Sequence, residues 1–191
     1  MNEEMMIQRA QNGELEAFQQ LVELHKKDLY FLSLNLTGNQ YDAEDLSQEV
    51  FIKAYQGLKG FRGDAKFGSW LYRIAVNTNI NRNRKKSVRT VAVSENIGIG
   101  SGEAGRQSQG PDSLAEAAVI QEHIERAMQR LTDRERTVFV LRHYHDYKLK
   151  EIAGMLRINT GTVKSTLFRA IQRLQEELEF YRDESGKEEY R

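Results

Sequence analysis

A segment with very little apolar surface divides this chain and limits the folds open to it. Residues 92–114 are rich in glycine and serine, include the only proline, Pro111, and have no aromatic residue. Such a segment cannot bury enough apolar surface to offset the conformational entropy lost on ordering. We therefore expect a flexible linker between two small domains, residues 1–91 and 115–182, with a charged tail at 183–191.

Both domains are expected to be helical. One proline in 191 residues supplies little turn punctuation, and the Leu, Glu, Gln, Arg and Ala content favours helices. The fold class is therefore predicted as all-α, with two small helical domains joined by the linker. No run approaches the roughly 18 apolar residues of a membrane span, and the N-terminus is acidic where a secretory signal is basic and then apolar. We expect a cytoplasmic protein with no direct membrane insertion.

The residue types argue against catalysis. Cysteine is absent, which excludes disulfides, thiol nucleophiles and thiolate zinc sites. His143 and His145 stand two residues apart on a predicted helix, so their rings diverge and joint metal ligation is not expected. The carboxylates within 42–45 are accounted for by capping of a helix N-terminus. Since no glycine-rich phosphate loop or nucleophile motif occurs, we predict a non-enzyme with no catalytic residue, no metal and no cofactor.

The charges of the chain are segregated, although its formal net charge is zero. Residues 62–91 carry a net charge of +7 and residues 134–174 one of +6, whereas the segments before, between and after them are acidic. Two basic surfaces predict two contacts with a polyanion such as nucleic acid, and the acidic surfaces suit docking on a basic protein. Solvated helix faces with chance clustering of charge are the alternative.

In the first domain, apolar residues repeat with helical spacing in three segments. The first helix follows the break at 12–13. The second opens at Asp42, with Asp45 as a partner resembling a capping box, and the third begins near Phe67 after a glycine-punctuated loop at 57–63. The outer side of the second helix is acidic but includes an exposed aliphatic residue, and its candidate docking residues are Asp45, Gln48, Glu49 and Ile52.

The third predicted helix is apolar on one side and basic or amide-bearing on the other. To bind single-stranded nucleic acid, a protein needs positive charge that neutralises the phosphate backbone and polar or aromatic groups that hold the unstacked bases. Packing in the core is the alternative for the aromatic residues, and we expect it as the main role of Phe67 and Trp70. The candidate nucleic-acid-binding residues of the loop and helix are Phe61, Arg62, Asp64, Lys66, Ser69, Arg73, Asn77, Asn81 and Arg84.

The second domain is predicted as four helices that end in a helix-turn-helix. Thr132 and Glu135 form a capping box, and a short helix at 149–156 is followed by a tight turn at 157–161 and a long final helix. The start of that last helix has residues suited to a DNA major groove, and a helical hairpin used only for protein contact is the alternative. The candidates are Thr162, Lys164, Ser165, Thr166, Phe168, Arg169 and Arg173.

The segments 42–55, 61–77 and 158–174, taken together, resemble bacterial extracytoplasmic-function sigma factors of the sigma-70 family. The resemblance implies an alternative sigma factor that binds core RNA polymerase and directs promoter-specific transcription initiation. By this resemblance the acidic helix face docks on the β′ clamp helices, while the loop at 61–66 and the following helix engage the opened −10 element. The helix-turn-helix would read the −35 element as duplex DNA beside the β flap, and an anti-sigma factor would control the protein.

Two other classes of protein compete with this interpretation. A helix-turn-helix repressor or activator that binds an operator without polymerase would explain the second domain, but it leaves the acidic second helix and the basic third helix without a role. A nucleic-acid-processing enzyme would need a metal-ligand or nucleophile constellation, which the sequence lacks.

Overall fold

The computed structural model describes residues 2–93 and 112–179, and within these ranges the regular structure is helical. The predicted tail at 183–191 and most of the predicted linker, residues 94–111, lie outside the described residues. The two ends of the predicted linker are helical, because one helix extends to Val93 and the next begins at Asp112. The elements are α1 (Glu3–Gln11), α2 (Leu15–Thr37), α3 (Gln40–Gly57), the 3-10 turn η1 (Leu58–Gly60), α4 (Phe67–Val93), α5 (Asp112–Arg130), α6 (Asp133–His143), α7 (Leu149–Leu156) and α8 (Thr160–Glu177).

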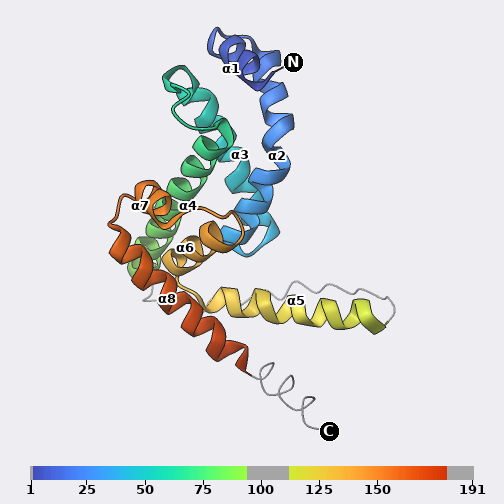
Figure 1. Ribbon diagram of the computed structural model, residues 1–191, viewed down its shortest axis with the longest axis vertical. Coiled ribbons are helices and arrows are strands. Elements are labelled where there is room, and N and C mark those ends of the chain that lie inside the picture. Colours follow the sequence, from blue (N-terminus) through green and yellow to red (C-terminus); the bar gives the residue numbers. More distant parts are fainter. Residues whose placement is uncertain (1, 94–111, 180–191) are drawn as a thin grey trace.

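Helices α1 to α4 form a first lobe, in which α2, α3 and α4 pack against one another (Figure 1). Each presents an apolar stripe to the shared core, where Leu21, Leu46 and Leu71 are fully buried. The start of α3 differs from the expectation, since Asn39 is the N-cap and accepts a 2.8 Å hydrogen bond from the Asp42 N–H. Asp42 therefore pairs with a cap three residues before it, and the predicted pair of Asp42 with Asp45 is wrong.

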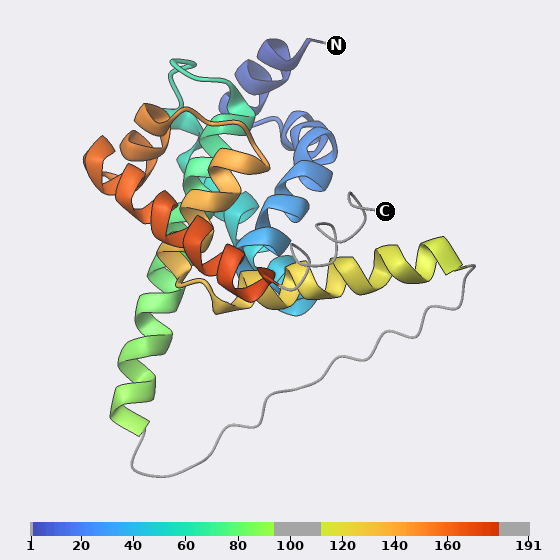
Figure 2. The ribbon, with the colours of Figure 1, turned by 60° about the horizontal axis from the view of Figure 1, so that its bottom comes forward.

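Helices α5 to α8 form a second lobe. The predicted capping box is confirmed, because the Thr132 N–H donates to Glu135 Oε2 at 3.0 Å and the Glu135 N–H donates to Thr132 Oγ1 at 3.3 Å. The turn of the helix-turn-helix is shorter than expected: α7 ends at Leu156 with Arg157 as its C-cap, and Asn159 already caps α8. Figure 2 shows α5 and the far end of α4 projecting away from the packed helices.

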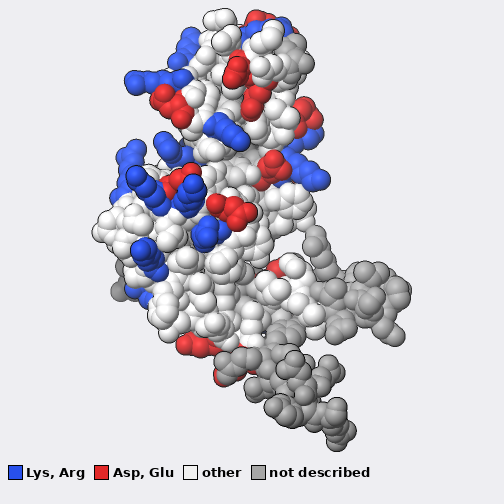
Figure 3. Space-filling model, viewed as in Figure 1, with Lys and Arg blue, Asp and Glu red and all other residues white. Residues whose placement is uncertain are grey.

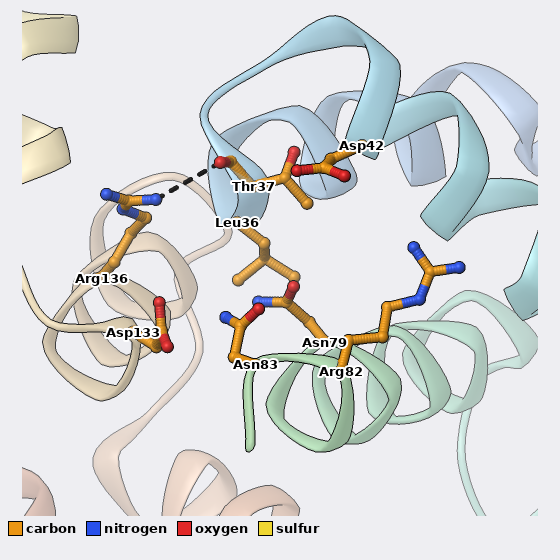
Figure 4. A pocket seen from close by; sticks show the side chains of 8 residues that line it. All are labelled: Leu36, Thr37, Asp42, Asn79, Arg82, Asn83, Asp133 and Arg136. Carbon is orange, nitrogen blue, oxygen red and sulfur yellow. Dashed lines mark hydrogen bonds between the residues drawn. The ribbon is translucent and has the colours of Figure 1, made fainter. Parts of the chain in front are cut away.

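The two lobes contact each other, which the sequence did not indicate. The buried Arg136 of α6 donates from Nε to the Met128 carbonyl at 3.0 Å and from Nη1 to the Thr37 carbonyl at 3.5 Å, so it joins α2 to the second lobe. A cavity of about 140 Å³ lies beside this contact (Figure 4). It is lined by Leu36, Thr37, Asp42, Asn79, Arg82, Asn83, Asp133 and Arg136.

A second contact between the lobes is aromatic. The rings of Tyr72 on α4 and His145 have centroids 4.9 Å apart, and Tyr147 lies 6.3 Å from Tyr72. Burial raises the pKa of Tyr72 to about 12, with the charge of Asp28 adding to the shift. Burial lowers the pKa of His145, and the charge of Asp28 opposes that shift only in part. Both side chains are therefore neutral at pH 7 and pack as apolar rings.

Candidate functional site

A groove of about 490 Å³ runs between α4 and the α3–η1 segment. Arg73, Asn77 and Asn81, all predicted to bind nucleic acid, line it together. They repeat every four residues along α4, which places them on one helix face. The Asn77 amide donates to the Arg73 carbonyl at 2.8 Å. The other lining residues are Lys53, Gly57, Gly60, Trp70, Ile74 and Thr78.

Gly60 lines one end of this groove and leads directly into a loop at 61–66, of which residues 62–66 are exposed. Its first residue, Phe61, is half-buried and packs against the rings of Trp70 at 5.0 Å and Phe67 at 5.6 Å. Phe67 is buried, which confirms its expected packing role, whereas Trp70 is half-buried and also lines the groove. The packed rings of Phe61, Phe67 and Trp70 thus anchor the start of the loop. Its candidate residues Arg62, Asp64 and Lys66 are all exposed. Arg84, the last candidate on α4, is exposed as well.

Ser69 does not lie in the groove with the other candidates of α4. Its Oγ accepts a 3.2 Å hydrogen bond from the Tyr147 hydroxyl, so it lies at the contact between the lobes. The sequence placed it on one stripe with Arg73 and Asn77, but Ser69 and Tyr72 belong to the side that the second lobe covers.

The predicted docking face on α3 is held by an ion-pair network that we call the Arg82 clamp, formed by Arg82, Asp45, Glu49 and Lys53. Arg82 Nη1 lies 2.9 Å from Asp45 Oδ2, while Arg82 Nε donates to Glu49 Oε2 at 2.6 Å and Nη2 contacts the same oxygen. Lys53 Nζ lies 2.6 Å from Glu49 Oε1 and donates to Thr78 Oγ1 at 3.1 Å. Figure 4 shows the Arg82 guanidinium turned away from Arg136.

The sequence suggested that Glu49 is a free acidic group on the outer surface of α3. In the structure it is instead paired with Arg82 and Lys53. Burial alone would raise its pKa, but the hydrogen bonds from Lys53 and Arg82 outweigh burial and hold the pKa of Glu49 below its ordinary value. The exposed members of the predicted docking set are Asp45, Gln48 and Ile52. Ile52 is 58% exposed, so an aliphatic side chain stands in water within a polar face.

The helix-turn-helix presents the start of α8 to solvent. Lys164, Ser165, Phe168 and Arg169 are exposed, as predicted for residues that reach DNA. Thr162 is half-buried, and both its N–H and its hydroxyl donate to Oδ1 of the N-cap Asn159, at 2.6 and 2.9 Å. Figure 3 shows lysine and arginine side chains gathered over α7 and the beginning of α8, which makes this face suited to a polyanion.

Two candidates of α8 differ from the expectation. Thr166 is only 1% exposed, so its side chain cannot reach DNA, and its Oγ1 instead accepts a 3.4 Å hydrogen bond from Arg169. Arg173 Nη1 lies 2.9 Å from the buried Glu135, whose other carboxylate oxygen is 3.7 Å from Arg169 Nε. The guanidinium of Arg173 thus ties α8 to the N-terminus of α6 while remaining partly exposed.

Lys53 and Trp70 line the groove, although sequence reasoning did not assign them to nucleic acid. The spacing of Glu49 and Lys53 at i and i+4 is a signal for an ion pair along α3, but it does not show that the ammonium also reaches α4. Among the described residues, no three His, Asp or Glu side chains gather as metal ligands. No helix within those residues is long and apolar enough to cross a membrane.

Comparison with known proteins agrees with this geometry. Residues 21–89 match the family model of sigma-70 region 2, and residues 121–174 match that of sigma-70 region 4. The ECF RNA polymerase sigma factor SigW of Bacillus subtilis is 35% identical over 183 residues, covering 92% of this chain and 98% of that protein. The ECF RNA polymerase sigma-E factor of Escherichia coli is 32% identical over 174 residues, covering 89% of this chain and 91% of that protein.

A solved structure shares the fold. The sigma factor RpoE from Bartonella quintana, in complex with the anti-sigma factor NepR, matches with a TM-score of 0.66 at 23% identity, over 85% of this chain and 96% of that chain. Two sigma-70 family models that match in order along one chain define a transcription initiation factor, and the chain belongs to the sigma-70 family. Within that family it is an extracytoplasmic-function sigma factor. Sigma factors are DNA-binding transcription initiation factors rather than enzymes, and the predicted family and all-α fold are confirmed.

Proposed function

We propose that the first lobe of this sigma factor docks on core RNA polymerase and holds the opened −10 element, while the second lobe reads the −35 element as duplex. One observation carries the assignment of the first lobe: three polar side chains of α4 line a single groove beside the exposed loop at 61–66. Arg73 supplies charge for the backbone, and the amides of Asn77 and Asn81 supply hydrogen bonds for unpaired bases. The loop supplies further charge, and the aromatic side chain of Phe61 anchors its start on Phe67 and Trp70.

The outer face of α3 is the docking surface that we propose for the β′ clamp helices. Ile52 supplies apolar contact, and Asp45 and Gln48 surround it with polar groups. Arg82 orients the carboxylates from the side of α4, so the face is presented in one arrangement. The β flap would lie against the second lobe, whose α8 side chains Lys164, Ser165, Phe168 and Arg169 would contact the −35 duplex.

The energetics of promoter opening explain why this sigma factor needs the polymerase. Opening ten base-pair steps costs about 14 kcal/mol at a mean near 1.4 per step, whereas each captured base returns about 1–3 kcal/mol. We propose that the groove captures bases only within the holoenzyme, in the cytoplasm where polymerase and chromosome meet. An anti-sigma factor that covers both lobes is the further partner that membership of the family favours.

Docking is tested with Ile52→Glu, which places a charge in the centre of the proposed apolar contact. We expect its affinity for core RNA polymerase to fall at least about tenfold, because charge is depleted from the centres of protein interfaces. Leu24→Glu is the matched control, since Leu24 on α2 is exposed to a similar degree, 54% against 58%. Equal loss in both variants, or no loss in Ile52→Glu, would reject the α3 face as the docking surface.

Strand capture is tested with Arg73→Ala and Asn81→Ala in reconstituted holoenzyme. Binding of a labelled single-stranded −10 oligonucleotide should weaken by about 1.5–3 kcal/mol when Arg73→Ala removes a charged backbone contact and by about 0.5–1.5 kcal/mol when Asn81→Ala removes a hydrogen bond to a base, while association with core polymerase stays unchanged. Lys27→Ala on α2 is the control, because it removes a comparable exposed charge from another helix. Tight duplex binding by the free protein with no effect of polymerase would favour the operator-binding alternative instead.

A further inference from the structure

The short helix α1 contacts the turn from which the exposed loop begins, although it precedes the residues matched to sigma-70 region 2. Gln11, the last residue of α1, donates from Nε2 to the Leu58 carbonyl at 3.0 Å and to the Phe61 carbonyl at 2.8 Å. These carbonyls stand at the two ends of η1, and the Phe61 N–H also donates to the Leu58 carbonyl at 3.0 Å. One amide group therefore holds both ends of the turn that leads into the loop at 61–66.

The chemistry of this contact leaves no choice of partner atoms. A backbone carbonyl only accepts hydrogen bonds, and a glutamine amide nitrogen has two hydrogens, so one N–H serves each carbonyl. Both hydrogen bonds are partly buried, where replacing such a donor by an apolar or acidic group leaves the carbonyls without it. Two attachment points also fix the orientation of the turn relative to α1, which a single hydrogen bond would not do.

Helix α1 is itself fixed to α2, so Gln11 acts from a rigid support. At its start, Glu3 Oε1 lies 2.7 Å from His25 Nε2, and the His25 ring packs 5.3 Å from the Phe67 ring. At its end, Arg9 lies 2.6 Å from Glu14 across a turn in which Gly13 has a φ of +96°, a value that glycine adopts without strain.

The loop depends on that support for its direction. Phe61 is the last residue held by Gln11, and its ring rests on Phe67 and Trp70. Residues 62–66 are exposed. The orientation of the Phe61 peptide group therefore sets the direction in which these side chains leave the body of the lobe.

We propose that Gln11 is a positioning residue for base recognition in the −10 element, acting through the Leu58 and Phe61 carbonyls. This inference rests on the proposed function of the loop. Gln11 does not touch DNA; it sets the geometry with which the loop distinguishes one base from another.

The test compares a variant that loses the donor with one that keeps it. Gln11→Met preserves side-chain length without any N–H, whereas Gln11→Lys retains three N–H donors at a similar reach. Gln8→Met, at an exposed position of the same helix, is the matched control. Each variant is assembled with core polymerase, and its dissociation constants are measured for single-stranded oligonucleotides with the −10 sequence selected by the wild-type holoenzyme and with each single-base change.

The ratio of dissociation constants for changed and selected sequences is the decisive readout, since a general loss of stability would weaken binding to all sequences alike. We expect Gln11→Met to lower this ratio at least about fivefold, and Gln11→Lys and Gln8→Met to stay within about twofold of wild type. Equal loss in the Met and Lys variants, or an unchanged ratio in Gln11→Met, overturns the role of Gln11. A wild-type holoenzyme that fails to discriminate among the oligonucleotides would instead overturn the proposed function of the loop.

Discussion

Replacing Arg82 by Ala removes the centre of the clamp that joins α3 to α4. Arg82 makes two charged contacts with Glu49, one with Asp45, and a further 3.2 Å hydrogen bond from Nη2 to the Asp45 carbonyl. The variant leaves Glu49 with Lys53 as its remaining ion-pair partner. We therefore expect loss of stability in the first lobe rather than loss of a surface charge alone.

The magnitude follows from the exposure of the partners. The Arg82 and Glu49 side chains are 22% and 34% exposed, so their contacts are only partly screened by water, whereas Asp45 is 63% exposed and contributes little. Buried charged hydrogen bonds contribute about 1.5–3 kcal/mol, and partial exposure reduces the expected total for the clamp to about 2 kcal/mol. For a chain of this length that loss lowers Tm by about 4–8 °C.

The pH dependence gives this prediction a second, independent readout. The pKa of Glu49 in the folded protein lies below its ordinary value of 4.5. As pH falls, the Glu49 carboxylate is therefore protonated in the unfolded chain before it is protonated in the folded protein. The contribution of the clamp is therefore complete above pH 4.5 and is lost as pH falls through the lower folded-state pKa. The difference between wild type and Arg82→Ala should narrow over that acidic range.

Urea unfolding at neutral and acidic pH, followed by far-UV circular dichroism, measures both effects. Arg84→Ala is the matched control, because Arg84 is exposed on the same helix two residues further on. Loss of less than about 0.5 kcal/mol at pH 7 in Arg82→Ala would show that the network is no more than a surface ion pair. A difference that persists undiminished at low pH would exclude Glu49 as the partner that matters.

Three further predictions concern the second lobe and its contact with the first. Thr132→Ala removes the acceptor for the Glu135 N–H and should cost about 1 kcal/mol in urea unfolding, and an unchanged midpoint would contradict the role of the capping box. Gly38→Ala forces a non-glycine residue to a φ of +78° with its Cβ 3.4 Å from Arg136 Nη1, so Tm should fall by about 2–4 °C for a cost near 1 kcal/mol; an unchanged Tm would show that the backbone relaxes. Burial holds the pKa of His145 below 6.5, so as pH falls this imidazole is protonated in the unfolded chain before it is protonated in the folded protein. The free energy of unfolding should therefore decrease as pH falls below 6.5. Urea unfolding at pH 7.5 and 5.5 measures this decrease, which His145→Phe should abolish.

Much of the helical structure could be predicted because its causes are local. Thr132 and Glu135 are three residues apart, so their capping box could be read directly from the sequence. Burial of Thr166 had a local signal too, since it lies three residues after the buried Val163 and four before the buried Ala170. The hydroxyl of Thr166 suggested a contact with DNA, but its position on the apolar stripe of α8 buries it.

The candidate site was predicted less completely, because its contacts join residues far apart in the chain. Arg82 and Glu49 are 33 positions apart, and no helical spacing shows that one will neutralise the other. Tyr147 and Ser69 are 78 positions apart and belong to different lobes, so the covering of Ser69 depends on how the lobes pack.

The sequence by itself determined the family, the division into two lobes and the helices other than α1, which the sequence analysis did not predict, because apolar periodicity, caps and motifs depend on residues within a few turns of one another. Only the tertiary structure decided which polar faces stay free. It turned Glu49 toward Arg82, placed Ser69 against Tyr147 and brought Gln11 to the Phe61 carbonyl 50 residues away. The physical reason is that a helical repeat shows which side chains share a face, whereas the element that covers that face is chosen by packing of the whole chain.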